Sequence, residues 1–266
     1  MAVLDFFAIH PVFTREEFVR FLTGRGASSV ETANTHLRRY RAAGRIGRVK
    51  RGVYVAASPG EPAARSPVDF LLVASRLAPD AVLAYHTALE AHGYAQSLFE
   101  RLFFLTTTKA KAVHFRARQF VPVLPLAGLR RKQHAFIFCG EVERRGLSCR
   151  VTAVERTLVD VLDRPDLAGG LEEVWRSLTG VPMLDLDMVV EYVRLCGQAM
   201  LAAKVGFFLA QRRDALGVPE PVLTRLQTLR PKQPRYLDRR LGGKMAADWN
   251  LIVPTPILNR DWEAVR

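Results

Sequence analysis

The sequence predicts an α+β protein, because segments of helical and of strand periodicity occupy different parts of the chain. Short helical segments come first, and the alternating run "RIGRVKRGVYV" follows them at residues 45–55. Strand-like runs fill the middle of the chain, and helical periodicity dominates from Val154 onward. With 266 residues, of which 49% are hydrophobic, the chain is long and apolar enough to bury a substantial core.

Two helices and a turn are predicted at the N-terminus. The first helix covers Met1–Ile9, which is a short apolar stretch. The second begins after Thr14, because a threonine followed three residues later by Glu17 forms a capping box, in which each side chain binds the other residue's backbone amide. The glycines of the segment Gly24–Gly26 then predict a turn.

A third helix and a β-hairpin complete this region. Ser28 or Ser29 caps the helix, which ends at Gly44. Its apolar residues recur at helical spacing: Val30, Ala33, Leu37 and Tyr40. The run at residues 45–55 alternates as two short strands do. Three helices followed by a hairpin predict a winged helix-turn-helix domain at residues 1–57.

The rest of the chain is predicted to form a linker and a mixed α/β C-terminal domain. The segment "SPGEPAARSP", rich in proline, predicts a linker at 58–66, and the second domain covers 67–266. Helices are expected at Val68–Leu77, Tyr85–His92, Val154–Leu162, Leu171–Leu178, Leu186–Leu195, Met200–Leu216 and Val222–Leu229, and strands at Leu102–Thr107, Val113–Val123, Ala135–Val142, Ser148–Val151 and Asn250–Val253.

The positive charge is concentrated near the N-terminus. The formal net charge is +13, and residues 1–57 hold ten Lys or Arg against four Asp or Glu. From Thr32 to Ala57 there are seven basic residues and no acidic one. A charge of this kind favours a polyanionic partner, and its concentration on one helix and one hairpin favours nucleic acid over a merely solvated cationic surface.

The third helix and the hairpin carry the predicted contacts with double-stranded DNA. On a helical projection, Thr32, Thr35 and Arg39 lie opposite the apolar face. Arg38 lies at the edge of that polar face, and Asn34 and Arg41 lie nearer the apolar margin. Arginine can bind guanine, asparagine can bind adenine, and hydroxyl groups can bind phosphate. The candidate residues are Ser28, Thr32, Asn34, Thr35, Arg38, Arg39 and Arg41 on the helix, and Arg45, Arg48, Lys50 and Arg51 in the hairpin.

Three segments resemble the AbiEi-type antitoxins of type IV toxin–antitoxin systems. The first is Leu37–Val55, with its Arg-Gly-Val-Tyr segment at 51–54. The second is "AYHTALEAHGYA" at Ala84–Ala95. The third is Val151–Trp175, whose matching residues are Glu155, Arg156, Thr157, Asp160, Gly169 and Gly170. The resemblance covers about residues 10–215.

The resemblance implies a winged-helix transcriptional repressor that is also an antitoxin. Its N-terminal domain would bind inverted repeats in the DNA upstream of its own operon. Its C-terminal domain would counter a toxin similar to nucleotidyltransferases, and no stable complex with that toxin is required. Two other functions remain open: a free-standing transcription factor with a sensing or dimerising C-terminal domain, and a nuclease or transferase that the N-terminal domain guides to nucleic acid.

The sequence predicts no enzymatic activity, no cofactor and no metal site. Asp185 and Asp187 resemble paired metal carboxylates, but they lie at a predicted helix start, where they cap free amides. Glu155 and Asp160 are expected to anchor Arg156 or to cap helices. The remaining candidates do not have the spacing of a catalytic or metal site: the pair Glu141 and Glu143, and the set His86, Glu90 and His92.

Two further features bear on location and on the C-terminus. Three widely spaced cysteines, Cys139, Cys149 and Cys196, and the absence of a signal-peptide pattern lead us to expect a cytoplasmic protein without a membrane segment. The run "RPKQPRYLDRR" at 230–240 holds five basic residues and an aromatic one. It is expected to be a solvated loop, with a nucleic-acid contact as the alternative.

Overall fold

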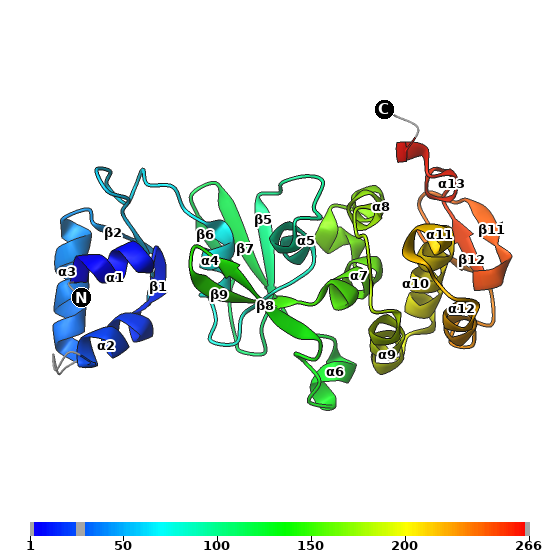
Figure 1. Ribbon diagram of the computed structural model, residues 1–266, viewed down its shortest axis with the longest axis horizontal. Coiled ribbons are helices and arrows are strands. Elements are labelled where there is room, and N and C mark those ends of the chain that lie inside the picture. The colour runs from blue at the N-terminus through cyan, green and yellow to red at the C-terminus, as the bar shows by residue number, and fades with distance from the viewer. Residues whose placement is uncertain (1–2, 25–29, 264–266) are drawn as a thin grey trace. The chain divides into compact units, whose positions relative to one another are not determined.

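The computed structural model describes residues 3–24 and 30–263, and it divides into two compact units (Figure 1). The first unit consists of residues 1–83, 100–123 and 141–150, and the second consists of residues 84–99, 124–140 and 151–266. The fold is a mixture of helices and several sheets, which confirms the predicted α+β class. In the part of the chain that is described, no helix has the combination of length and apolar composition needed to cross a membrane.

The N-terminal part of the first unit follows the predicted order of helices and hairpin. Its elements are α1 (Val3–Ile9), β1 (Val12–Thr14), α2 (Arg15–Thr23), α3 (Val30–Ala42), β2 (Ile46–Lys50) and β3 (Val53–Ala56). The predicted capping box is present, with Thr14 Oγ1 accepting from the Glu17 amide and Glu17 accepting from the Thr14 amide. Strand β1 was not predicted. It pairs antiparallel with β3 and gives a sheet of order β1-β3-β2.

The remainder of the first unit is helix α4 (Phe70–Ser75) and most of a six-stranded sheet. The sheet order is β6 (Val113–Phe115), β7 (Arg118–Val123), β5 (Arg101–Leu105), β4 (Val82–Leu83), β9 (Leu147–Thr152) and β8 (Cys139–Arg144). The prediction of one strand over Val113–Val123 is wrong. The chain reverses at Arg116, whose φ is +53°, and forms two antiparallel strands there.

The segment predicted as a linker is held by hydrogen bonds. Ser66 Oγ is buried and accepts from the Ser58 amide at 2.8 Å. The Ala63 amide donates to the Gly44 carbonyl at 2.9 Å. The guanidinium of Arg116 donates to the carbonyls of Ala63 and Ser66, each at 2.7 Å. Residues 58–66 are therefore packed against the strand turn that holds Arg116, and the domain limits at 57 and 66 stay a prediction.

The second unit is mainly helical. Its helices are α5 (His86–His92), α6 (Ala127–Arg131), α7 (Val154–Asp163), α8 (Leu171–Thr179), α9 (Leu186–Cys196), α10 (Ala199–Gln211), α11 (Arg213–Leu216), α12 (Glu220–Gln227) and α13 (Thr255–Asn259). The single helix predicted over Met200–Leu216 is divided at Arg212 into α10 and α11. The strand predicted from Ala135 begins only at Cys139, because the carbonyls of Ala135 and Ile137 accept hydrogen bonds from Arg156.

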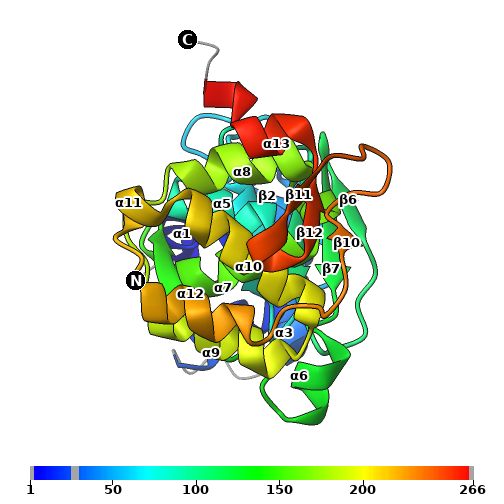
Figure 2. The ribbon, with the colours of Figure 1, turned by 90° about the vertical axis from the view of Figure 1, so that its right-hand side faces the viewer.

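A 3-10 turn at Ala247–Trp249, which joins two strands of a small sheet near the C-terminus, packs on α10 (Figure 2). The order of the sheet is β10 (Arg235–Tyr236), β12 (Leu251–Val253) and β11 (Lys244–Ala246). Gly206 makes this packing possible, because a Cβ atom there would lie 2.0 Å from the ring of Trp249. Of these strands, β12 was predicted, whereas β10 and β11 lie in a stretch with no strand periodicity.

The stability of the protein is expected to fall as the pH drops below about 6.5, because of His86. This side chain is 1% exposed, and burial lowers its pKa from the usual 6.5 despite Glu173 at 3.7 Å. The unfolded chain therefore binds a proton at a pH where folded His86 stays neutral, which costs up to about 1.4 kcal/mol per pH unit. Urea unfolding at pH 5.5 and 7.5 measures the effect. The free energy of unfolding of His86→Phe should change less between the two pH values than that of the parent protein. An equal change in both proteins would mean that His86 does not cause the pH dependence.

Candidate nucleic-acid interface

The aromatic core of the N-terminal region sets the orientation of α3. Ala33 and Leu37 are buried in a cluster with Phe6, Phe7, Phe13, Phe18, Leu22, Ile46 and Ala56. The opposite side of the helix is therefore turned to solvent, since residues on one helix face recur every three to four positions. Thr35, Arg38 and Arg39 are exposed there, as the helical projection predicted.

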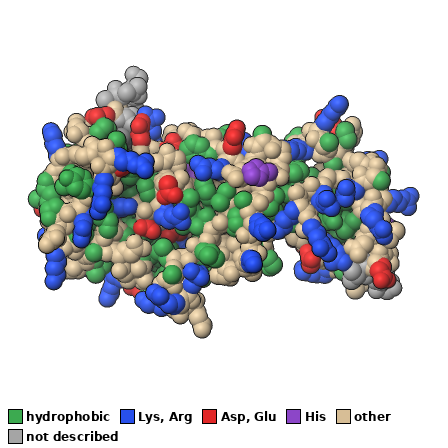
Figure 3. All heavy atoms as spheres, turned by 180° about the vertical axis from the view of Figure 1, so that it is seen from behind, with side chains coloured by type: hydrophobic (Ala, Val, Ile, Leu, Met, Phe, Trp, Pro, Cys, Tyr) green, Lys and Arg blue, Asp and Glu red, His purple; other side chains and the backbone are tan. Residues whose placement is uncertain are grey.

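The hairpin adds a second group of cations beside this helix. Strands β2 and β3 are antiparallel, with Arg48 opposite Tyr54 and a register shift between Arg48 and Lys50. Gly52, with φ of +85°, makes the tight turn between the strands. Arg45, Arg48 and Arg51 are exposed. Basic side chains gather over this region, at the right-hand end of the face seen in Figure 3.

The exposed arginines of α3 and the hairpin are not neutralised within the domain. These arginines are Arg38, Arg39, Arg41, Arg45, Arg48 and Arg51. None of them forms an ion pair with any residue in 3–24 or 30–263. The acidic residue of α3 is Glu31, in its first turn. Unpaired guanidinium groups keep their full capacity to bind phosphate oxygens and base edges. We refer to these six arginines and Thr35 as the basic surface.

Two of the predicted DNA-binding residues on α3, Asn34 and Thr32, are half-buried rather than exposed. The side-chain oxygen of Asn34 accepts from Arg15 Nε at 2.9 Å, which links α2 to α3. Arg15 could not be assigned this role from the sequence, since its partner lies 19 residues away. Ser28 lies outside the described residues.

Lys50, which was predicted to bind DNA phosphate, makes a contact within the protein. Its ammonium group donates to the carbonyl of Leu77, in the same unit. Burial lowers the pKa of Lys50, as expected for a cation taken partly out of water. A neighbouring contact joins Glu17 to Arg76 at 3.1 Å. These two contacts could not be predicted from local sequence patterns, because they join residues 27 and 59 positions apart.

We expect Lys50→Met to act on stability rather than on DNA binding. The buried Leu77 carbonyl loses its donor, so the free energy of unfolding should fall by about 1 kcal/mol. Affinity for duplex DNA should stay within about twofold of the parent, since the ammonium group of Lys50 is held at the Leu77 carbonyl and is partly buried. Arg48→Met is the matched control and should weaken DNA binding without loss of stability. Urea unfolding and fluorescence anisotropy check both. Equal losses of DNA affinity in the two variants would mean that Lys50 binds DNA as Arg48 does.

The residues considered for catalysis have structural roles in the second unit. Asp185 caps α9 by accepting from the Met188 amide at 2.9 Å, and Asp187 pairs with Arg225. Glu155 accepts from the Asp185 amide at 3.0 Å. Asp160 binds Arg156, as expected for an anchoring residue. The described residues hold no group of three or more His, Cys, Asp or Glu side chains that could bind a metal.

The other candidates are dispersed as well. Glu141 accepts from the hydroxyl of Ser148 at 2.7 Å. The His92 ring bonds to the Thr152 carbonyl at 2.8 Å, whereas His86 is packed against Phe99 with a ring separation of 4.1 Å. These side chains do not converge on one point.

Comparison with known proteins assigns the N-terminal region. Residues 1–57 match the family model described as "Transcriptional regulator, AbiEi antitoxin". The matched residues include the whole of the basic surface. The resemblance noted at 84–95 and 151–175 lies outside this match and stays a prediction. Among curated proteins, none matches the chain.

A solved structure shares the fold over most of the chain. The protein is similar to the RV2827C protein from Mycobacterium tuberculosis, with 18% sequence identity and a TM-score of 0.53. The alignment covers 94% of this chain and 89% of that one. At this identity the similarity concerns the fold alone. The match to the family model therefore carries the assignment, and residues 1–57 of this protein are a transcriptional-regulator domain of the AbiEi antitoxin type.

Proposed function

We propose that residues 1–57 form a winged helix-turn-helix domain that binds double-stranded DNA. The observation that carries this proposal is the basic surface, on which six exposed arginines have no ion-pair partner in the described chain. Helix α3 would lie in the major groove, with Arg38 and Arg39 reading base edges. The hairpin would bind the adjacent backbone through Arg48 and Arg51.

The protein would act as a repressor of its own operon and as an antitoxin. The family of residues 1–57 supports this role. The DNA target would be inverted repeats upstream of the operon, and the toxin would be similar to nucleotidyltransferases. No catalytic step and no cofactor are part of the proposal. Neutralisation would not require a stable complex with the toxin.

Selection of duplexes from a random library by the full-length protein tests the DNA-binding part. Enrichment of one sequence that also occurs upstream of the gene, with affinity falling steeply as salt rises, is expected. Binding to random duplexes with equal affinity would reject a regulator of one operon.

Co-expression with a nucleotidyltransferase-like toxin tests the antitoxin part. The full-length protein is expected to restore growth. The DNA-binding variant R38A/R39A should restore it as well when both genes are under an external promoter, because neutralisation would belong to residues 67–266. Failure of the parent protein to restore growth would favour a free-standing transcription factor.

A further inference from the structure

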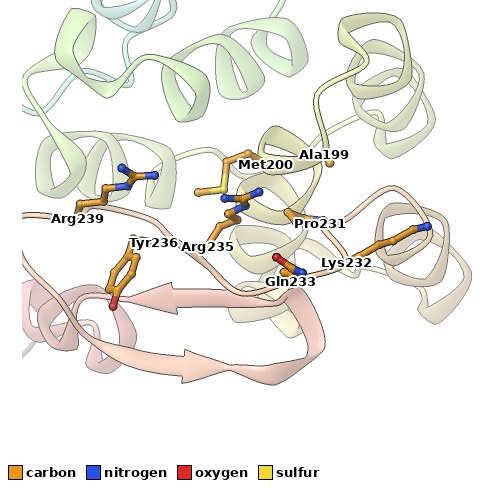
Figure 4. A pocket seen from close by; sticks show the side chains of 8 residues that line it. All are labelled: Ala199, Met200, Pro231, Lys232, Gln233, Arg235, Tyr236 and Arg239. Atoms are coloured by element: carbon orange, nitrogen blue, oxygen red, sulfur yellow. The ribbon is translucent and has the colours of Figure 1, made fainter.

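A pocket of about 530 Å³ in the second unit lies outside the basic surface (Figure 4). The start of α10 supplies Ala199 and Met200, and the chain between Pro231 and Arg239 supplies the rest of the lining. This volume is large enough for one nucleotide-sized ligand, and the pocket is open to solvent rather than enclosed.

Three cations line this pocket. They are Lys232, Arg235 and Arg239, and all three side chains are exposed. No acidic residue lines it, and none of the three forms an ion pair with another residue of the described chain. In the view of Figure 4 the guanidinium group of Arg235 lies next to Met200, Arg239 lies farther along the same segment, and Lys232 extends away from both. Cations gathered without counter-charge in a concave site favour an anionic ligand.

The first turn of α10 adds to this positive potential. Ala199 and Met200 are the first two residues of a 13-residue helix, and Gln198, its N-cap residue, makes no side-chain hydrogen bond to that turn. The amide groups at a helix start carry a partial positive charge and suit phosphate oxygens. The pocket thus combines this helix start with three cationic side chains from a separate segment.

We propose that this pocket binds a phosphodiester of single-stranded nucleic acid. Arg235 and Arg239 would hold the phosphate, and the apolar side chains of Met200 and Pro231 would contact the attached base. Tyr236, which also lines the pocket, is 46% exposed. Positively charged grooves with exposed aromatic side chains are typical of single-strand binding sites. A duplex keeps its bases stacked inside, so it could not place one in a concave pocket of this size.

Fluorescence anisotropy of the full-length protein with labelled oligo-U and oligo-dT of about twelve nucleotides tests the proposal. All variants are made in the R38A/R39A/R48A/R51A background, so that the residues of the basic surface proposed to bind DNA contribute little. R235A/R239A is expected to bind at least about tenfold more weakly and to lower the salt slope by about 0.7, because one phosphate contact is lost. The control R131A/K132A removes the same charge from the end of α6 and should bind within about twofold of its parent.

Three results would overturn the proposal. One is unchanged binding by R235A/R239A, and another is an equal loss in R131A/K132A. The third is displacement of the oligonucleotide by micromolar ATP, which would assign the pocket to a mononucleotide instead. Thermal unfolding confirms that each variant is folded. Duplex affinity, measured for R235A/R239A with the basic surface intact, should be unchanged, so the outcome is independent of the proposed operator binding.

Discussion

Replacing Arg38 and Arg39 by alanine is expected to weaken binding to the cognate duplex by about thirtyfold or more, since each base contact is worth about 1–3 kcal/mol. Both side chains are exposed on the face of α3 opposite the buried Ala33 and Leu37. Neither has a counter-charge in the described chain, so no internal interaction is lost with them. Binding to random duplexes should fall much less, and discrimination between the two should therefore shrink.

The hairpin provides the comparison that separates base contacts from phosphate contacts. R48A/R51A removes the same charge from residues expected to bind the backbone. This variant should weaken cognate and random duplexes by the same factor and reduce the salt slope by about 1.8, or 0.9 for each phosphate. R131A/K132A on α6 controls for net charge alone. If R38A/R39A and R48A/R51A reduced the preference for cognate over random duplexes equally, α3 would not be the helix that reads bases.

Much of the N-terminal region was predictable because its signals are local. The capping box at Thr14 and Glu17 needs only a spacing of three residues, and the structure contains both of its hydrogen bonds. The exposed face of α3 follows from the helical repeat of its apolar residues. Gly52 has a positive φ, as a turn between two short strands requires.

Other features depend on contacts that no local pattern encodes. The Lys50 ammonium finds its acceptor at Leu77, and Asn34 finds its donor at Arg15. The pocket at α10 joins residues about 30 positions apart along the chain, and its cations lie in a segment without periodicity. Charge and spacing identified which cations could bind nucleic acid, but only the packing shows which of them are free to do so.

Arg156 also shows why strand β8 begins later than predicted. Its Nη1 and Nη2 donate to the carbonyls of Ile137 at 2.6 Å and Ala135 at 3.0 Å. Its Nε donates to Asp160 at 3.2 Å, and the hydroxyl of Tyr192 donates to the other oxygen of Asp160 at 2.8 Å. The guanidinium is 1% exposed, so this network is isolated from water. Burial is the largest single influence and opposes its charge, but Asp160 together with Tyr192 and Cys139 raises the pKa of Arg156 on balance.

Arg156→Met is therefore expected to destabilise the protein by about 3–5 kcal/mol, the usual cost of removing one partner from a buried ion pair. Two buried carbonyls lose their donors, and the carboxylate of Asp160 is left without a counter-charge. Arg176→Met is the matched control, because Arg176 also pairs with an acidic residue four positions away, Glu172, but on the surface. Its loss should be below about 0.5 kcal/mol. Urea unfolding of both variants measures the difference.

The pH dependence of Arg156→Met identifies the cause of its instability. Burial raises the pKa of Asp160, and the charge of Arg156 opposes that rise in the parent protein. Without Arg156, folded Asp160 should hold a proton at a pH where the unfolded chain has released it, so stability falls as the pH rises above about 4. The variant should thus be less destabilised at pH 5 than at pH 7.5, and R156M/D160N should lose this difference. Arg156→Met could instead lower the free energy of unfolding equally at both pH values, with or without Asp160→Asn. That result would mean that the lost hydrogen bonds to the carbonyls, rather than the unpaired carboxylate, cause the destabilisation.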